Sequence, residues 1–155
     1  MKRNIWLFLL FFCTSAIAIQ QSPLNLKVNY LTTPLGIDAR AFFSWELNNV
    51  DRNIMQSAWQ ILVSSDKQSL EGDKGTFCDS GKITSGETVQ IPYNGTTLQS
   101  GMRYYWKVRV WNGKDNVSPY SDITWFETGL LKATDGKRTW IGEGKIPPEK
   151  SEDFY

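Results

Sequence analysis

The alternation of apolar and polar side chains is clearest from Arg103 to Asn112, and it predicts a β-strand. Successive residues of a strand point to opposite faces, so this segment has one face suited to a core and one suited to solvent. The first face holds Tyr104, Trp106, Val108 and Val110, and the second holds Tyr105, Lys107, Arg109 and Trp111. Leu98 precedes Tyr104 by six residues, which fits a tyrosine corner, where the phenol hydroxyl satisfies a backbone group at the strand entrance.

Six more segments with strand character are separated by turn-rich stretches, which brings the expected total to about seven strands. They cover residues 24–31, 41–47, 58–64, 77–82, 87–91 and 121–128. Pro92 and Pro119 fall between strands, where a sheet tolerates proline. The stretch through Gly72 and Gly75 is expected to be a charged loop, and no amphipathic helix is expected inside the sandwich. The pattern predicts an all-β, antiparallel β-sandwich over residues 19–128.

The aromatic residues divide into two groups by their expected faces. Trp45, Trp59, Tyr104 and Trp106 take inward positions, and we expect them in the core because each ring buries a large apolar area. Tyr105, Trp111, Tyr120 and Trp125 take outward or loop positions. Exposed apolar patches usually mark an interface, so Trp111, Tyr120 and Trp125 are the candidate binding residues. Their partner is either a neighbouring domain or a sugar ring stacked on an aromatic platform.

The first 18 residues have the organisation of a signal peptide. Lys2 and Arg3 form a basic start, residues 5–12 an apolar stretch, and Ala16-Ile17-Ala18 a small-residue cleavage site. The apolar stretch is shorter than the roughly 18 residues that a membrane-spanning helix needs. We expect cleavage after Ala18 and a secreted or periplasmic protein, with no membrane association once the leader is removed.

Cysteine count and charge narrow the possible functions further. Cys13 leaves with the leader, so Cys78 remains alone and is expected to be an unpaired, half-buried apolar residue. The formal net charge of the whole chain is only +1, and the leader removes two basic residues and no acid. A nucleic-acid partner is not expected, because there is no basic surplus to neutralise phosphates.

No set of residues with the pattern of a catalytic or metal site is evident. The chain has no histidine, which excludes Ser-His-Asp and Cys-His nucleophiles as well as zinc sites that use histidine. Glycosidase chemistry needs only two carboxylates, but the acids of the sandwich fall in loops or on solvent faces. These are Asp38, Glu46, Asp79, Glu87, Asp115, Asp122 and Glu127. We expect no catalytic residue, no metal and no cofactor in this chain.

The character of the sequence changes after Thr128. Residues 129–142 are expected to be a linker that ends on the apolar pair Trp140-Ile141. Residues 143–155 are rich in Pro, Glu and Lys, and they are too few for a second domain and too polar to complete the first. They are expected to be the start of a further domain or a disordered tail.

Several stretches, taken together and in order, resemble the N-terminal module of secreted bacterial α-L-rhamnosidases, and the sandwich pattern resembles a fibronectin type III or immunoglobulin-like fold. The resemblance runs from about Leu24 to Gly142. It rests on YLTTPLGID at 30–38, FSWEL at 43–47, AWQILV at 58–63, DSGK at 79–82, YYWKVRVW at 104–111, WFETGLL at 125–131 and WIG at 140–142.

The resemblance implies an accessory role. In that family the module precedes further β-sandwich domains and a catalytic (α/α) barrel, whose carboxylates hydrolyse terminal α-L-rhamnosides with inversion. No part of the barrel is expected in this sequence, so no catalytic residue is carried over, and the expected partners are the downstream domains of the parent enzyme. Two other functions stay open: a free-standing carbohydrate-binding module, and a protein-interaction module of the secreted space.

Overall fold

The computed structural model describes residues 21–48 and 55–132. The expected leader at 1–18 and the polar segment at 143–155 lie outside these residues, as does the expected linker beyond Lys132. The predictions about these parts of the chain stay predictions. Within the described ranges, no helix is long and apolar enough to cross a lipid bilayer.

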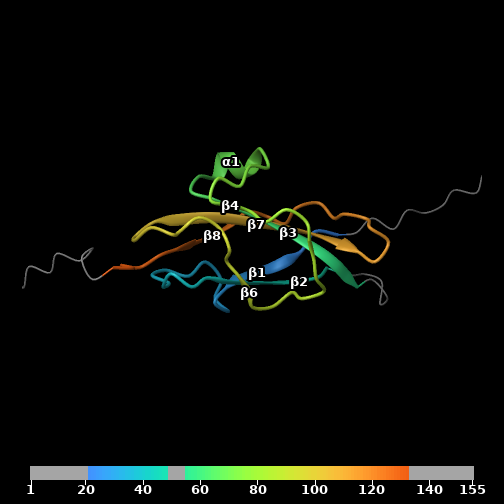
Figure 1. The fold of residues 1–155 in the computed structure, drawn as a ribbon, viewed down its shortest axis with the longest axis horizontal. Coiled ribbons are helices and arrows are strands. Elements are labelled where there is room, and N and C mark those ends of the chain that lie inside the picture. The colour runs from blue at the N-terminus through green and yellow to red at the C-terminus, as the bar shows by residue number, and fades with distance from the viewer. Residues whose placement is uncertain (1–20, 49–54, 133–155) are drawn as a thin grey trace, which may run out of the picture.

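Two antiparallel sheets lie face to face (Figure 1). The smaller sheet has the order β1 (Leu24–Val28), β2 (Phe42–Glu46) and β6 (Ile91–Pro92). The larger sheet has the order β4 (Cys78–Asp79), β3 (Gln56–Ser64), β7 (Arg103–Asn112) and β8 (Thr124–Glu127), and β5 (Ile83–Thr84) also pairs with β3. The predicted all-β sandwich is confirmed, with eight strands in the described residues where the pattern indicated about seven.

The pairing of β3 with β7 determines which side chains face the core. Val63 lies opposite Trp106, and Gln60 lies opposite Arg109. Directly opposed residues share a face of the sheet, so the first pair points inward and the second outward. The inward side chains of β7 are fully or almost fully buried, and they are Tyr104, Trp106, Val108 and Val110.

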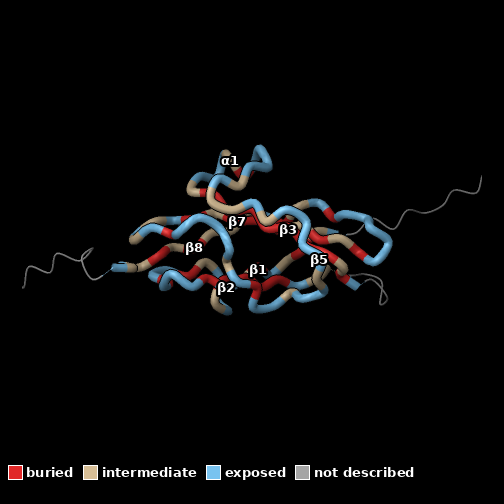
Figure 2. Tube along the Cα trace, in the orientation of Figure 1, coloured by how far each residue is buried: buried red, intermediate tan, exposed pale blue. Residues whose placement is uncertain are grey.

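Aromatic contacts join the two sheets through the core. The ring of Phe43 on β2 lies 4.4 Å, between centroids, from that of Trp106 on β7. Trp45 on β2 meets Trp59 on β3 edge to face at 6.0 Å. Such aromatic pairs add to the free energy gained from burying their surface. Figure 2 shows buried positions along strands of both sheets.

Tyr104 closes the loop that leads into β7. Its hydroxyl accepts a hydrogen bond from the backbone N–H of Gln99 at 2.8 Å, and its side chain is fully buried. This is the contact of a tyrosine corner. The neighbouring residue, Leu98, is also buried in the core.

Several strand boundaries differ from the predicted ones. The strand expected to reach Leu31 ends at Val28, because Asn29 and Tyr30 adopt positive φ angles of 50° and 66° and form a tight turn. The single strand expected over 77–82 is two short strands, β4 and β5, with Gly81 at φ +60° between them. The last strand is shorter than expected and covers only Thr124–Glu127.

Pro92 was expected between strands but is part of β6. It lies opposite Phe42 of β2 at the edge of the smaller sheet. An edge strand accepts proline because one side of its backbone has no partner strand that requires an N–H donor. The strand expected over 87–91 is correspondingly short and late, covering Ile91–Pro92 only.

A short helix, α1 (Lys67–Glu71), replaces part of the loop expected through Gly72. Asp66 caps its start by accepting a hydrogen bond from the backbone N–H of Ser69 at 2.7 Å. The helix lies on the outer face of the larger sheet, against β3 and β7 (Figure 1). A helix of one turn is too short for the period of an amphipathic helix to show in the sequence.

The helix also corrects the expectation that Lys107 lies on a solvated face. Lys107 is only 5% exposed, because α1 and the residues after it cover this part of the sheet. Leu62 lies opposite Lys107 on the same face, and both Leu62 and Leu70 of α1 are fully buried there. Part of the outer face is thus a second, smaller buried layer.

Candidate functional site

The outer face of the larger sheet carries a row of cations and aromatic rings. β7 places Arg103, Lys107, Arg109 and Trp111 on this face, because they alternate with its inward residues. Other elements add the remaining members. We call this surface the cation–aromatic face, and it consists of Lys82, Arg103, Lys107, Arg109, Trp111, Tyr120 and Trp125.

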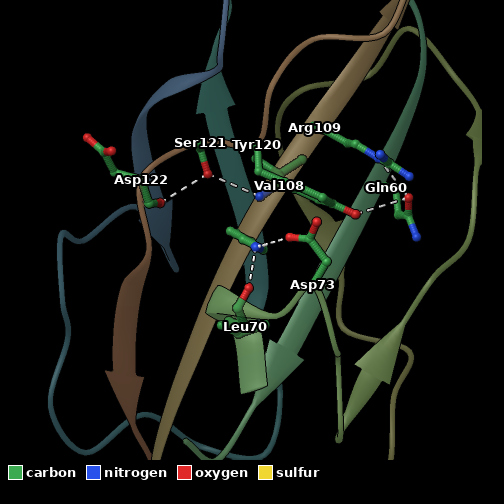
Figure 3. Close-up of polar contacts among 9 residues, drawn as sticks. Gln60, Leu70, Asp73, Val108, Arg109, Tyr120, Ser121 and Asp122 are labelled. Carbon is green, nitrogen blue, oxygen red and sulfur yellow. Dashed lines mark hydrogen bonds and ion pairs between the residues drawn. The ribbon is translucent and has the colours of Figure 1, made fainter. Parts of the chain in front are cut away.

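Arg109 is the centre of the row. Its guanidinium carbon lies 4.7 Å from the ring centre of Tyr120 and 5.1 Å from that of Trp111. Its Nε donates to the side-chain oxygen of Gln60 at 2.9 Å, and the Tyr120 hydroxyl donates to the same oxygen at 3.3 Å. Gln60 in turn donates to Asp79 at 2.6 Å. Figure 3 shows Arg109 and Tyr120 converging on Gln60.

Lys107 extends the row toward α1. Its ammonium group donates to the backbone oxygen of Leu70 and to the carboxylate of Asp73, and it lies 4.4 Å from the ring centre of Tyr120. Burying a cation is costly unless it is paired and hydrogen-bonded, and both conditions hold here. These contacts tie α1 and the turn after it to β7 (Figure 3).

The ends of β7 carry one further aromatic–cation pair each. Lys82 lies 5.1 Å from the ring centre of Trp111 and also pairs with Asp115. At the other end, the guanidinium of Arg103 lies 3.9 Å from the ring centre of Trp125. The structure therefore brings Trp111 and Tyr120 together around Arg109, whereas Trp125 lies at the far end of the strand.

All three candidate binding residues are half-buried, and a cation already lies against each ring. A sugar ring that stacked on the same side of the ring as the cation would have to displace it. The sequence pattern identified the outward aromatic residues. It did not identify Gln60, Lys107 and Arg109 as the residues that contact them. The outward positions of Lys107 and Arg109 were visible in the alternation, whereas nothing local pointed to Gln60.

Two groups on or near this face have pKa values shifted by their surroundings. Hydrogen bonds from the backbone and the hydroxyl of Ser69 lower the pKa of Asp66, which keeps that carboxyl ionised. Burial raises the pKa of Tyr120, although the nearby positive charge of Arg109 acts to lower it. Within residues 21–48 and 55–132, no cluster of His, Cys, Asp and Glu could hold a metal ion.

A cleft of about 400 Å³ lies where the open edges of the two sheets approach each other. Its lining is mainly apolar and includes Phe43, Trp59, Ile61, Cys78, Asp79, Ile91 and Tyr93. Cys78 is unpaired, and burial followed by the charge of Asp79 raises the pKa of its thiol, which disfavours the reactive thiolate. Asp79 is the single carboxylate in this lining.

Comparison with known proteins identifies the family. Residues 23–132 match the family described as Rha78A-like, N-terminal immunoglobulin domain. An α-L-rhamnosidase of Formosa agariphila is 36% identical over 148 residues, which is 91% of this chain and 16% of that protein. An α-L-rhamnosidase of Streptomyces avermitilis is 37% identical over 116 residues, which is 74% of this chain and 11% of that protein.

Solved structures agree with this match. The α-L-rhamnosidase from Dictyoglumus thermophilum superposes with a TM-score of 0.72 at 41% identity, over 75% of this chain and 13% of that one. The α-L-rhamnosidase of S. avermitilis, solved with L-rhamnose, gives 0.71 at 35% identity, over 75% and 11%. The chain thus spans between about a tenth and a sixth of the length of these relatives. It belongs to the family of Rha78A-like N-terminal immunoglobulin domains of α-L-rhamnosidases.

Proposed function

We propose that this chain is the non-catalytic N-terminal accessory module of an exported α-L-rhamnosidase, and that it packs on the domains that follow it. The observation that carries the proposal is the family match over residues 23–132. In the two α-L-rhamnosidases compared by sequence, the matching part is 16% and 11% of the protein. Domains that share one chain and a short connection are held at high local concentration, which favours contact between them.

The side chains of the sandwich support a role without catalysis. A glycosidase holds two carboxyl groups on either side of the scissile bond, and the environment raises the pKa of one of them. Here the cleft near Trp59 has a single carboxylate, Asp79, which is engaged by Gln60. On the cation–aromatic face, the carboxylates of Asp73, Asp115 and Glu127 are paired with cations.

The first experiment measures turnover of an aryl α-L-rhamnoside and calorimetric binding of L-rhamnose by the purified chain. The parent enzyme that contains this module serves as the positive control. We expect no turnover and no tight binding. Turnover that disappears on mutation of one of the chain's own acids would overturn the accessory role. Rhamnose binding at millimolar or lower concentration, lost in Trp111→Ala or Tyr120→Ala, would instead establish a carbohydrate-binding module.

Export is the second part of the proposal, and it rests on the basic, apolar and small-residue segments of the first 18 residues. The test is expression of the chain in a bacterial host, followed by N-terminal sequencing of the protein outside the cytoplasm. We expect a mature chain that starts at Ile19. Replacement of Ala18 by a bulky residue in the variant Ala18→Trp should block cleavage there, and an intact Met1 on exported protein would contradict the proposed site.

A further inference from the structure

Arg109 is the one cation of the cation–aromatic face that has no carboxylate within ion-pair distance among the described residues. The other cations of this face are paired: Lys82 with Asp115, Arg103 with Glu127, and Lys107 with Asp73. The carboxylate of Asp79 reaches Arg109 only through Gln60, which donates to Asp79 and accepts from Arg109. The charge of Arg109 is therefore not matched by direct contact with an anion.

The guanidinium of Arg109 also has hydrogen-bond donors to spare. A guanidinium carries five N–H donors in a planar fork. Nε uses one of them on Gln60 at 2.9 Å, and within residues 21–48 and 55–132 the donors on the two terminal nitrogens have no acceptor. In Figure 3 the dashed line from Arg109 leads only to Gln60. The free end of the fork matches a carboxylate, which accepts two parallel N–H bonds.

The fork is held in place before any partner binds. Gln60 is buried and fixes Nε of Arg109, while the rings of Tyr120 and Trp111 lie 4.7 Å and 5.1 Å from the guanidinium carbon. Gln60 is itself held by its hydrogen bond to Asp79. Binding is weakened by the entropy lost when a long side chain is immobilised, and a side chain that is already fixed loses less.

The side chains around Arg109 are of the kinds that dominate protein interfaces. Tyr, Trp and Arg are enriched among the residues that contribute most to binding, and such residues cluster at the centre of an interface. Trp111 and Tyr120 are half-buried, so a domain that covers this face would remove further apolar surface from water. It would also desolvate Arg109, and a desolvated cation is costly unless it is paired. A partner that covers the face must therefore bring a carboxylate to the fork.

We propose that the domains that follow this module pack on the cation–aromatic face, and that Arg109 receives the carboxylate of an Asp or Glu side chain from them. The inference rests on the proposed accessory function, and it names the surface and the chemistry of the contact. The two terminal nitrogens of Arg109 donate to the two oxygens of that carboxylate. The rings of Trp111 and Tyr120 lie beside this ion pair and limit its contact with water, which strengthens it.

The first test compares the reactivity of arginine side chains in the purified chain and in the parent enzyme that contains the module. Phenylglyoxal modifies accessible guanidinium groups, and peptide mass spectrometry gives the rate at each arginine. We expect Arg109 to react several-fold more slowly in the parent enzyme than in the chain. Arg40 is the internal control, because it is exposed and precedes β2 of the smaller sheet. Its rate should be the same in both proteins.

The second test asks whether the contact is an ion pair. Arg109→Met keeps an apolar side chain that can pack on the rings but removes the charge, whereas Arg109→Lys keeps the charge but removes the fork. Hydrogen exchange of the β7 amides is measured in the chain and in the parent enzyme, and the difference is compared for each variant, so that effects on the module alone cancel. We expect slower exchange in the parent enzyme. Both substitutions should remove most of this difference, and the matched control Arg40→Met should leave it unchanged.

Four results would overturn the proposal. Equal reactivity of Arg109 in the chain and in the parent enzyme would show that no domain covers the fork. Slow β7 exchange that persists in the parent enzyme with Arg109→Met would show that the face packs without an ion pair. Protection of Arg40 in place of Arg109 would assign the contact to another surface of the module. Protection of Arg109 that rises with the concentration of the chain alone would assign the face to a second copy.

These failures differ from a failure of the accessory role. The turnover and rhamnose-binding assays of the chain do not depend on which surface of the module is covered. A module that is inactive but docks through another surface would contradict only the assignment of Arg109.

Discussion

At the scale of single residues, burial and hydrogen bonding decide which side chains the sandwich depends on. Trp45 lies in the core, and its indole N–H donates to Gln56 at 3.0 Å. The core also holds two indole nitrogens, in Trp59 and Trp106, with no hydrogen-bond partner among the described residues. A buried polar group without a partner costs stability, so the packing of these two rings must outweigh that cost.

Replacement of Trp45 by alanine should lower the free energy of unfolding by about 3–5 kcal/mol, because it removes buried apolar surface and leaves a cavity between the sheets. Denaturant unfolding followed by circular dichroism measures the effect. Lys114→Ala is the surface control, because Lys114 is exposed. Equal midpoints for the two variants would show that Trp45 does not contribute to the core.

Tyr104→Phe should cost about 1 kcal/mol, because the Gln99 N–H loses its acceptor while the ring remains in place. The matched control is Tyr105→Phe, which removes the hydroxyl of the adjacent, half-buried tyrosine on the other face of β7. Chemical denaturation of both variants separates the two effects. A Tyr104→Phe variant as stable as the parent protein would mean that the corner hydrogen bond contributes nothing.

At the scale of elements, α1 depends on its contacts with the sheet, including those of a buried cation. A helix of five residues is too short to be stable alone. Its attachment comes from the burial of Leu70, from the Asp66 cap and from the contacts of Lys107 with Leu70 and Asp73.

Lys107→Met keeps an apolar side chain of similar length but removes the ammonium donor. We expect it to cost about 2 kcal/mol, since a buried oxygen of Leu70 and the Asp73 carboxylate lose a charged partner. Amide hydrogen exchange should show faster exchange at Gly72 and Lys74, whose N–H groups close the turn after α1. In contrast, Lys82→Met breaks an exposed pair with Asp115 and should cost less than about 1 kcal/mol. Equal effects of the two substitutions would contradict the anchoring role of Lys107.

At the scale of the whole molecule, burial of weak acids makes the sandwich sensitive to alkali. Burial raises the pKa of Cys78 above its ordinary value of 9.0, and that of Tyr93 and Tyr120 above 10.0. As the pH passes these ordinary values, the unfolded chain releases protons that the folded chain retains. The unfolded state then binds fewer protons than the folded state, so the free energy of unfolding decreases.

We therefore expect the melting temperature to be insensitive to these three groups below about pH 8 and to fall progressively above about pH 9. Calorimetry across this range measures the fall. Cys78→Ala should make the first part of the fall shallower. Ser80→Ala, a nearby substitution that removes no titratable group, should lower the whole curve without changing its slope. A wild-type curve that stays flat to about pH 11 would contradict the stated pKa directions.

Features of this molecule could be predicted from the sequence where they depend only on residues that are close together in the chain. The period of β7 is a local property, so its strand, its two faces and the inward positions of Tyr104 and Trp106 followed from the residues alone. The β-sandwich could be predicted because several segments with strand character follow one another along the chain. Strand ends were less predictable, since turns such as that at Asn29 and Tyr30 depend on backbone angles that many residues can adopt.

Contacts between distant segments were decided only by the tertiary structure. The alternation of side chains predicts that Lys107 and Arg109 point outward. It does not predict which residues contact or cover them. Lys107 is buried because Leu70, 37 positions earlier, folds over it, and Arg109 is held by Gln60, 49 positions earlier. Residues 34–37 likewise lie beside the end of β8, where the Gly129 N–H donates to the Ile37 oxygen. Local periodicity gives the direction of a side chain, whereas its burial depends on which distant segment covers it, and that is a property of the fold as a whole.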